Sequence, residues 1–486
     1  MKKKSDWKAI LRFLGIMLVA EGGLMALCVI PALHFADGTV VPVSTSAAFT
    51  LTVGALLWVS YGRYRHIEDR RISYLLVTLM WLTLTLFATL PLISTGTTFN
   101  FTKAWFEAMS GITSTGATIF PQVASLPSSV LLWRSMTQWF GGFGIVLLVL
   151  ALTPRLGINK YALYTAEASG ADNSGRKAVS TATTVRRTLG VYLVLTLLFI
   201  VLLKFSGMQI WDAVNLTCTN ISSGGFSIYN DSIASLNTIQ QLILTAAMLL
   251  SGVSFMLLFY FFTLRWKQLS HKLDQFGFYL LLCVLSIFFV STGLYLHDGI
   301  QPIDALRLGT VQTVSALTTT GSVVADTSLW WTPLCFLLLM LSVCGGMAGS
   351  TAGGLKVMRV LILLRNARSI LRERLHPRAV SPLRLNGQPV SSHIRSNVMV
   401  LFMVYTFTLL GGTMVLMLCG VGATESIGAA VGCLTGYGPG LGASGGLGSY
   451  AVFPSAALWF CSLLMLLGRL ECMTVLILFL PRFWHR

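Results

Sequence analysis

A short polar stretch that ends in glycine occurs four times along the chain, each time between two long apolar runs. The clearest copy is Leu317-Thr318-Thr319-Thr320-Gly321-Ser322. The other copies are Ile112-Thr113-Ser114-Thr115-Gly116-Ala117, Asn220-Ile221-Ser222-Ser223-Gly224-Gly225 and Leu434-Thr435-Gly436-Tyr437-Gly438-Pro439. Their alignment pairs Gly116, Gly224, Gly321 and Gly438. Such a repeat constrains the fold strongly, because each copy belongs to one structural unit and the units must pack together.

The composition places these units in a membrane. Hydrophobic residues make up 55% of the 486 residues and charged residues only 10%, which is too apolar for a soluble globular protein. A membrane-spanning helix needs about 20 apolar residues. The sequence predicts spans at 10–33, 43–61, 73–94, 129–153, 187–206, 238–264, 276–296, 329–344, 396–419 and 455–480.

The four polar stretches are expected to be loops that face a cation path. Non-helical backbone at membrane depth is tolerated only where it is buried in protein or lines a water-filled cavity. Glycine allows a positive φ, so that successive carbonyl groups can face one axis, and a ring of carbonyls can replace the hydration shell of a cation. One such loop alone is more typical of a helix cap, but four equivalent loops favour a filter. Its predicted cation ligands are the backbone carbonyls of Ser114, Thr115, Gly116, Ser222, Ser223, Gly224, Thr319, Thr320, Gly321, Gly436, Tyr437 and Gly438.

The repeats predict an all-α polytopic membrane protein. Residues 1–71 form an N-terminal transmembrane hairpin, and each later unit has an outward span, a half-span helix, the polar loop and a return span. Asp212 and Asp304 are expected to cap two of the half-helices, and Thr424-Glu425 is expected to begin another. The units are residues 72–154, residues 155–264 with a cytoplasmic loop, residues 265–375 with an intramembrane glycine loop, and residues 376–486.

The charge pattern predicts the orientation. The net charge is +17, and most Lys and Arg residues fall on one side of the predicted spans, so the positive-inside rule puts both termini in the cytoplasm. No basic stripe lies on a soluble domain, and nucleic-acid binding is therefore not expected. The nine cysteines lack metal-ligand spacing and are interpreted as packing residues.

A glycine-rich segment interrupts the third return span. Each glycine costs a helix about 1 kcal/mol, so the segment is expected to unwind inside the membrane, although close helix packing would also explain such glycines. Lys356 follows directly and could instead extend to the cytoplasmic surface. The glycines are Gly345, Gly346, Gly349, Gly353 and Gly354.

Charged residues within spans are rare and usually face a bundle interior or cavity. Arg469 lies in the last predicted span, and Glu471 is too close along the helix to face it. Arg469 is expected either to face the path and repel cations or to pair with carbonyl groups. Glu21 and Glu471 receive no role from the sequence.

Four passages make the chain resemble the TrkH/Ktr/HKT superfamily of potassium transport proteins, and its TrkH branch in particular. They are Gln138-Trp139-Phe140-Gly141-Gly142-Phe143-Gly144, Ser223-Gly224-Gly225-Phe226-Ser227, Gly349-Ser350-Thr351-Ala352-Gly353-Gly354-Leu355-Lys356 and Gly468-Arg469-Leu470-Glu471. The similarity covers residues 73 to 486. Thr435-Gly436-Tyr437 and Asn220-Ile221 depart from the commoner pattern, which leaves the fine selectivity open.

This resemblance implies four M1–pore helix–M2 repeats around one central pore, with K+ as the transported ion and no organic cofactor. It further implies gating by the glycine loop, with Lys356 and Arg469 nearby. The expected setting is the bacterial inner membrane. The expected partners are membrane lipid, a second copy in a homodimer and a cytoplasmic nucleotide-binding ring of the TrkA type. Nucleotide sensing belongs to that ring, because no G-x-G-x-x-G follows a strand here.

Two other function classes would leave different signs in the sequence. A membrane enzyme would need paired acids, a His cluster or a nucleophile beside a base, and none occurs, so the protein is not expected to be an enzyme. A sodium- or proton-coupled potassium symporter of the same fold remains open, although the repeats share one orientation instead of forming inverted halves.

Overall fold

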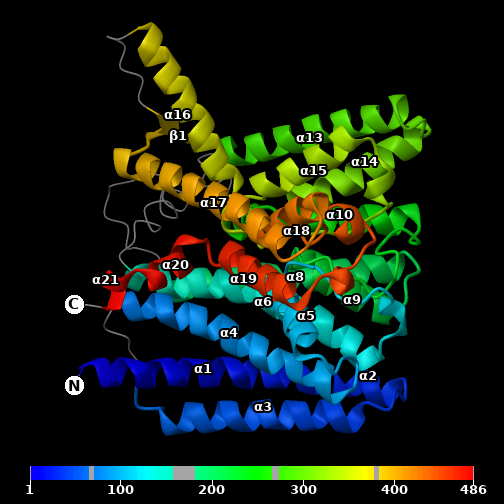
Figure 1. The fold of residues 1–486 in the computed structure, drawn as a ribbon, viewed down its shortest axis with the longest axis vertical. Coiled ribbons are helices and arrows are strands. Elements are labelled where there is room, and N and C mark those ends of the chain that lie inside the picture. The colour runs from blue at the N-terminus through cyan, green and yellow to red at the C-terminus, as the bar shows by residue number, and fades with distance from the viewer. Residues whose placement is uncertain (1, 65–69, 157–180, 265–272, 377–382, 485–486) are drawn as a thin grey trace.

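The computed structural model describes residues 2–64, 70–156, 181–264, 273–376 and 383–484. Long helices run side by side through the molecule, and both termini lie at the same end (Figure 1). The α-helices are α1 (Lys2–Leu27), α2 (Val29–His34), α3 (Val40–Ser60), α4 (Arg70–Ser94), α5 (Phe101–Ile112), α6 (Ser128–Leu156), α8 (Thr181–Phe205), α9 (Ile210–Ile221), α10 (Thr238–Ser251), α11 (Phe255–Phe262), α13 (Leu273–Leu296), α14 (Pro302–Leu317), α15 (Thr332–Cys344), α16 (Val357–Leu375), α17 (Ser392–Leu418), α18 (Ala423–Thr435), α19 (Ser455–Arg469), α20 (Met473–Leu476) and α21 (Pro481–Trp484).

The remaining regular elements are short. Strands β1 (Arg384–Leu385) and β2 (Gln388–Pro389) form an antiparallel hairpin. Five 3₁₀ helices lie in the described loops: η1 (Val123–Ser125), η3 (Thr327–Leu329), η4 (Gly442–Ser444), η5 (Tyr450–Val452) and η6 (Ile477–Phe479).

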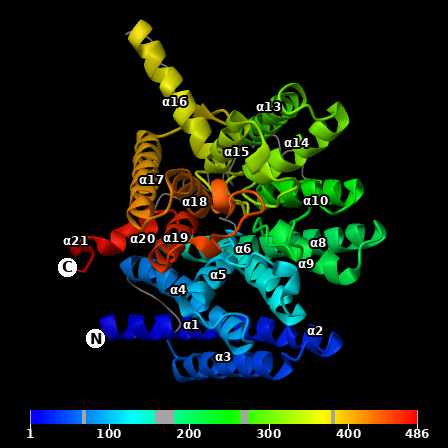
Figure 2. The same cartoon turned by 45° about the vertical axis from the view of Figure 1, so that its right-hand side comes forward.

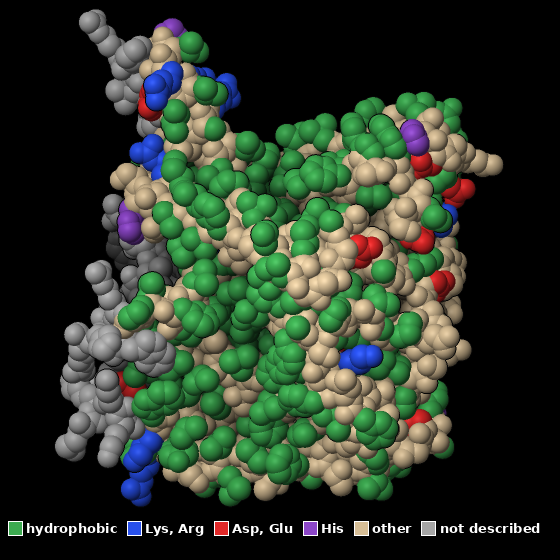
Figure 3. All heavy atoms as spheres, viewed as in Figure 1, with side chains coloured by type: hydrophobic (Ala, Val, Ile, Leu, Met, Phe, Trp, Pro, Cys, Tyr) green, Lys and Arg blue, Asp and Glu red, His purple; other side chains and the backbone are tan. Residues whose placement is uncertain are grey.

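The fold is that of an all-α polytopic membrane protein, as the sequence predicts. Six described helices are long and apolar enough to cross a membrane, and the number is eight when each of two sharply bent helix pairs is counted as one span. Hydrophobic side chains cover the middle of the face in Figure 3. Lys and Arg lie mostly toward the end that holds the termini, and Asp and Glu lie mostly at the other end.

Four short helices follow four long ones and surround the centre of the molecule (Figure 2). They are α5, α9, α14 and α18, and each ends at one of the repeated polar loops. The order of elements in the four units is α4–α5–α6, α8–α9–α10–α11, α13–α14–α15–α16 and α17–α18–α19–α20. The cytoplasmic loop expected before the second unit includes residues 157–180, which lie outside the described part of the chain.

The short helices begin differently from the prediction. Asp212 and Asp304 lie in the first turns of α9 and α14, and the N-cap residues are Gln209 and Gln301. The reason is that both carboxylates have side-chain partners: Asp212 accepts a hydrogen bond from the Tyr229 hydroxyl, and Asp304 pairs with Arg307. Acidic residues in the first turn still complement the positive end of the helix dipole.

Two predicted spans, 238–264 and 455–480, are not continuous. A bend of 106° separates α10 from α11, and another bend of 106° separates α19 from α20. At the first break, the Gly252 carbonyl accepts a hydrogen bond from the Met347 N–H (2.8 Å), and the Phe255 N–H donates to the Gly349 carbonyl (3.1 Å). The glycine loop therefore satisfies backbone groups that a continuous helix would have satisfied itself.

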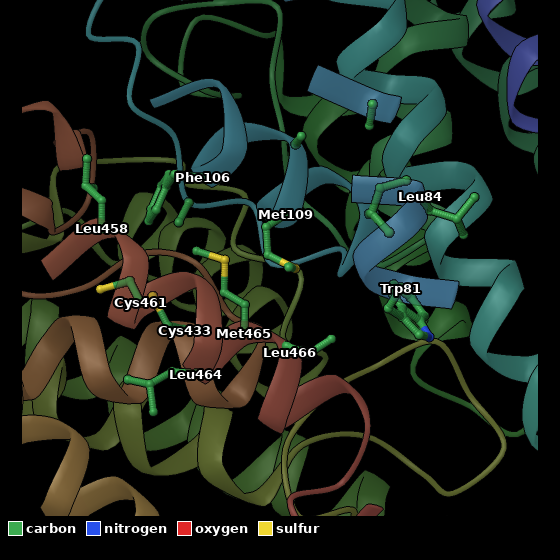
Figure 4. Packing of buried hydrophobic residues seen from close by; sticks show 14 of the residues in the cluster. Trp81, Leu84, Phe106, Met109, Cys433, Leu458, Cys461, Leu464, Met465 and Leu466 are labelled. Carbon is green, nitrogen blue, oxygen red and sulfur yellow. The ribbon is translucent and has the colours of Figure 1, made fainter. Parts of the chain in front are cut away.

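Hydrophobic side chains pack the four short helices against the long helices around them. One large cluster joins α1, α4, α5, α6, α18 and α19, and a second joins α8, α9, α10, α13, α14 and α15. Figure 4 shows part of the first cluster, in which side chains of α4, α5, α18 and α19 meet. The labelled residues, all buried, are Trp81, Leu84, Phe106, Met109, Cys433, Leu458, Cys461, Leu464, Met465 and Leu466.

Candidate ion filter and gate

The four polar loops share one backbone conformation. In each loop, a residue with a positive φ of 51° to 73° is followed two positions later by a glycine with a φ of 74° to 88°. The residue between them donates its N–H to the carbonyl five residues earlier, at 2.8 to 3.0 Å. The equivalent triplets are Ser114-Thr115-Gly116, Ser223-Gly224-Gly225, Thr319-Thr320-Gly321 and Gly436-Tyr437-Gly438.

This geometry corrects the alignment of the second loop by one residue. Gly225, with a φ of 74°, is the equivalent of Gly116, while Gly224 occupies the place of Thr115. Ser222, which the sequence placed among the cation ligands, is the C-cap residue of α9. Two adjacent glycines gave two possible alignments, and only the observed backbone conformation distinguishes them.

The loops touch one another in a closed cycle. A Cβ atom built on Gly116 would overlap the carbonyl oxygen of Gly224, and one on Gly225 would overlap that of Thr320. In the same way, Gly321 abuts the Tyr437 carbonyl and Gly438 abuts the Thr115 carbonyl. Each glycine therefore meets the carbonyl group that precedes the glycine of the next loop. We name the four triplets that make these contacts the carbonyl ring.

The carbonyl ring opens onto a cavity. All four ring glycines line this cavity, together with residues that follow them in the loops, among them Phe120, Tyr229, Val323 and Leu447. Only glycine fits at the last position of each triplet (Gly116, Gly225, Gly321 and Gly438), because a Cβ there would meet backbone atoms that cannot move aside.

A buried ion pair supports the ring from the side of α5 and α6. The Arg134 Nε atom lies 2.8 Å from Glu107 Oε1, and the two side chains are 3% and 1% exposed. Glu107 also accepts hydrogen bonds from Thr118 and from the Ile119 N–H, and Arg134 donates to the Ser227 carbonyl. The pair thus joins the segments that leave the first and second loops.

Sequence reasoning gave this ion pair no role. Two signals could have found it: an acidic residue in the apolar stretch of a half-helix and a basic residue in a predicted span. Charges in such places need a partner, because an unpaired buried charge is strongly destabilising.

The glycine-rich segment lies on the side of the carbonyl ring that faces away from the cavity. As predicted, the helix stops at Cys344 and resumes at Val357, and Gly345, Gly349 and Gly354 have positive φ values. We call residues 345–356 the glycine loop. Its hydrogen bonds reach the C-terminal ends of three of the four short helices, which are the half-helices predicted from the sequence. The Gly353 N–H donates to Thr319 Oγ1 (2.6 Å), the Gly354 N–H to the Thr435 carbonyl (2.9 Å), and the Thr351 hydroxyl to the Ile221 carbonyl (3.1 Å).

Arg469 reaches the fourth half-helix end. It is the last residue of α19, and its guanidinium donates to the Thr351 carbonyl (2.9 Å), the Gly141 carbonyl (3.2 Å) and Ser114 Oγ (3.4 Å). Of the two expectations for Arg469, the pairing with carbonyl groups is observed, whereas the repulsion of cations in the path stays a prediction.

Glu471 and Lys356 have their own partners, whereas the buried carboxyl of Glu21 has no hydrogen-bond partner among the described residues. Glu471 does not pair with Arg469 but accepts a hydrogen bond from Arg359 of α16 (2.8 Å). Lys356 folds back toward the glycine loop, and its ammonium group donates to the Ala352 carbonyl. Glu21 is fully buried in α1, outside the four units. Together, the glycine loop and Arg469 thus donate hydrogen bonds at the ends of all four short helices α5, α9, α14 and α18, on the side of the ring away from the cavity.

Comparisons with known proteins agree with this architecture. The family model described as "TrkH: Cation transport protein" matches residues 43–486. The Trk system potassium uptake protein TrkH of Halomonas elongata is 33% identical, and that of Escherichia coli K12 is 30% identical, each over 99% of both chains. The crystal structure of the potassium transporter TrkH from Vibrio parahaemolyticus superposes with a TM-score of 0.89 at 31% identity, covering 99% of this chain and 100% of the other. The chain therefore belongs to the TrkH family of cation transport proteins.

Proposed function

We propose that this protein takes up potassium through the carbonyl ring. The observation that carries the proposal is the closed cycle of contacts among four loops of equal conformation. The identity of the ion is inferred from relatives named as Trk system potassium uptake proteins, which are 33% and 30% identical over 99% of this chain. The proposed ligands are backbone carbonyls of the four triplets at 114–116, 223–225, 319–321 and 436–438.

The surroundings of the ring suit a dehydrated cation. Carbonyl oxygens can replace water in the hydration shell of potassium. The half-helices α5, α9, α14 and α18 end at the ring, and the C-terminal end of a helix carries a partial negative charge that favours a cation. The carboxylate of Glu107, which hydrogen-bonds the segment after the first loop, pairs with Arg134, so the proposed ligands are the backbone carbonyls.

We further infer that the glycine loop and Arg469 close the path. The loop lies across the side of the ring away from the cavity and donates to three half-helix ends, and Arg469 contacts the fourth. A positive guanidinium beside a cation path raises the barrier to a cation. Opening the path would require the loop to move and these hydrogen bonds to break together.

The proposed setting is the inner membrane of a bacterium with both termini in the cytoplasm. The basic side chains near the terminal end and the acidic ones at the other end support this orientation (Figure 3). The cavity would then face outward and the glycine loop inward. A homodimer and a cytoplasmic nucleotide-binding ring of the TrkA type are the proposed partners, and the "Trk system" in the relatives' names supports a multi-component assembly.

A flux assay tests the proposal. Purified protein in liposomes should move potassium down its own gradient without another ion, and Gly225→Ser should lower the ratio of potassium to sodium permeability. The reason is that Gly225 has a positive φ and abuts the Thr320 carbonyl. The matched control is Gly190→Ser, because Gly190 lies in α8 with nothing near its missing Cβ. Potassium movement that requires a sodium or proton gradient would instead support symport.

A further inference from the structure

One side chain from outside the loops holds the second loop in the carbonyl ring. Gln138 of α6 is fully buried, and its Nε2 atom donates to the Gly224 carbonyl (2.8 Å). Its Oε1 atom accepts from the Phe226 N–H (3.0 Å). A single amide therefore binds the residues on both sides of the ring glycine Gly225.

Gln138 also contacts the first loop. Its backbone carbonyl accepts a hydrogen bond from the Ser114 hydroxyl (3.2 Å). The Gly224 carbonyl that it binds is the one that abuts Gly116 of the first triplet. The residue therefore lies at the junction between the first and second quadrants of the ring.

The first and third loops hold themselves in a different way. In the first loop, the hydroxyls of Thr113 and Thr115 bond to each other at 2.8 Å. In the third loop, Thr318 and Thr320 form the same 2.8 Å bond. Each pair ties the C-cap residue of the half-helix to the middle residue of the ring triplet.

The second loop cannot form such a bond within itself. Its C-cap residue, Ser222, donates its hydroxyl to the carbonyl four residues earlier, as Thr113 and Thr318 do, but its middle residue is Gly224, which has no hydroxyl to complete the pair. A Cβ on Gly224 would overlap the side-chain amide of Gln138. Gln138 thus occupies the space that a threonine side chain would fill, which explains why this loop has two adjacent glycines.

From these contacts we propose that Gln138 is a positioning residue that fixes the Gly224 carbonyl in the ring and thereby determines the selectivity for potassium over sodium. The inference rests on the proposed function of the ring as a filter. Without the amide, the Gly224 carbonyl loses its donor and can rotate toward a smaller ion, so that sodium is coordinated better than in the native ring.

The main test replaces Gln138 by methionine, which keeps the length of the side chain but removes both hydrogen bonds. In liposomes, Gln138→Met should lower the ratio of potassium to sodium permeability about five-fold, the factor that corresponds to the loss of one hydrogen bond, the one to the Gly224 carbonyl. Gln241→Met is the matched control. Gln241 is also fully buried, but its amide binds the carbonyls of Ile233, Ala234 and Leu236, outside the ring. This control should lower the melting temperature and leave the permeability ratio unchanged.

A rescue variant gives a second, independent readout. Gln138→Ala makes room at Gly224, so the triple variant Gln138→Ala, Ser222→Thr and Gly224→Thr can form the threonine pair of the first and third loops. The ratio should be low in Gln138→Ala and higher in the triple variant, whereas Gly224→Thr alone should disrupt the ring because its side chain meets Gln138. Coupling between residues in contact is what such a cycle measures.

The outcomes separate this inference from the proposed function. A wild-type ratio in Gln138→Met, with a lowered ratio in Gly225→Ser, would overturn the role of Gln138 alone. A wild-type ratio in both variants would overturn the filter itself. If Gln138→Met does not fold, the comparison of Gln138→Ala with the triple variant decides, and equal ratios in those two would overturn the inference.

Discussion

Replacing Gly353 by alanine should open the proposed gate. Gly353 has no positive φ, so alanine is compatible with its backbone conformation. The obstacle is space, because a Cβ there would overlap the carbonyl of Thr435 at the end of α18. That carbonyl belongs to the backbone and cannot move aside easily, so the glycine loop must move instead.

The structure gives the size of the effect. Moving the loop breaks the bond from the Gly353 N–H to Thr319 Oγ1 and the bond from the Gly354 N–H to the Thr435 carbonyl. Each bond contributes about 1 kcal/mol, so the closed arrangement loses about 2 kcal/mol. That loss corresponds to an increase of about 30-fold in the ratio of open to closed molecules.

Potassium efflux from liposomes that contain only the purified protein measures this ratio. Gly411→Ala is the matched control, because Gly411 lies inside α17 with nothing near its missing Cβ. The flux through Gly353→Ala should rise while its selectivity for potassium over sodium stays that of the wild type, since the carbonyl ring is unchanged. Wild-type flux in a folded Gly353→Ala protein would refute the assignment of the glycine loop as the barrier.

Three further predictions concern charged side chains. Arg469→Ala should raise potassium flux per folded molecule by about five-fold or more, because a positive charge about 4 Å from a cation costs at least about 1 kcal/mol even in water; level flux with a lower melting temperature would mean that Arg469 only joins helices. Glu107→Gln should lower the free energy of unfolding by about 3 kcal/mol or more, since it leaves the charge of Arg134 buried and unpaired. In thermal melting, the double variant Glu107→Gln, Arg134→Met should regain part of that loss. Burial alone would raise the pKa of the Asp37 carboxyl, but hydrogen bonds from Thr39 and Ser129 outweigh it and hold the pKa below 3.8. The carboxylate therefore stabilises the fold above pH 3.8 and loses this effect as the pH falls through its lower folded pKa. The difference in melting temperature between the wild type and Asp37→Asn should shrink below that pH. A constant difference would contradict the role of these hydrogen bonds.

The sequence predicts those features that depend on local pattern. The four loops and the unwound glycine segment follow from glycines at particular positions, and the apolar runs predict the helices around them. The breaks after Ser251 and Arg469 do not follow, because the apolar pattern continues through both. They form because partners far along the chain, such as Met347 at Gly252, satisfy the freed backbone groups.

Long-range pairing is the other part that the sequence leaves open. Arg359 and Glu471 are separated by 112 residues, and nothing in the neighbourhood of either one identifies the other. The alignment of the second loop depends in the same way on Gln138, which lies 86 residues before Gly224. The sequence pattern identifies residues in unusual places, but their partners are determined by tertiary packing between segments far apart in the chain.

The carbonyl ring is encoded four times in a single chain, and this affects how it can change during evolution. In a pore made of four identical subunits, one substitution alters every quadrant at once. Here a mutation at Thr115, Gly224, Thr320 or Tyr437 alters one quadrant and leaves three intact. The middle residues of the triplets are threonine, glycine, threonine and tyrosine: paired hydroxyls hold the two threonines, Gln138 holds Gly224 and Gln312 holds Tyr437. With the ring as the proposed filter, single substitutions would therefore change the ion preference of one quadrant at a time.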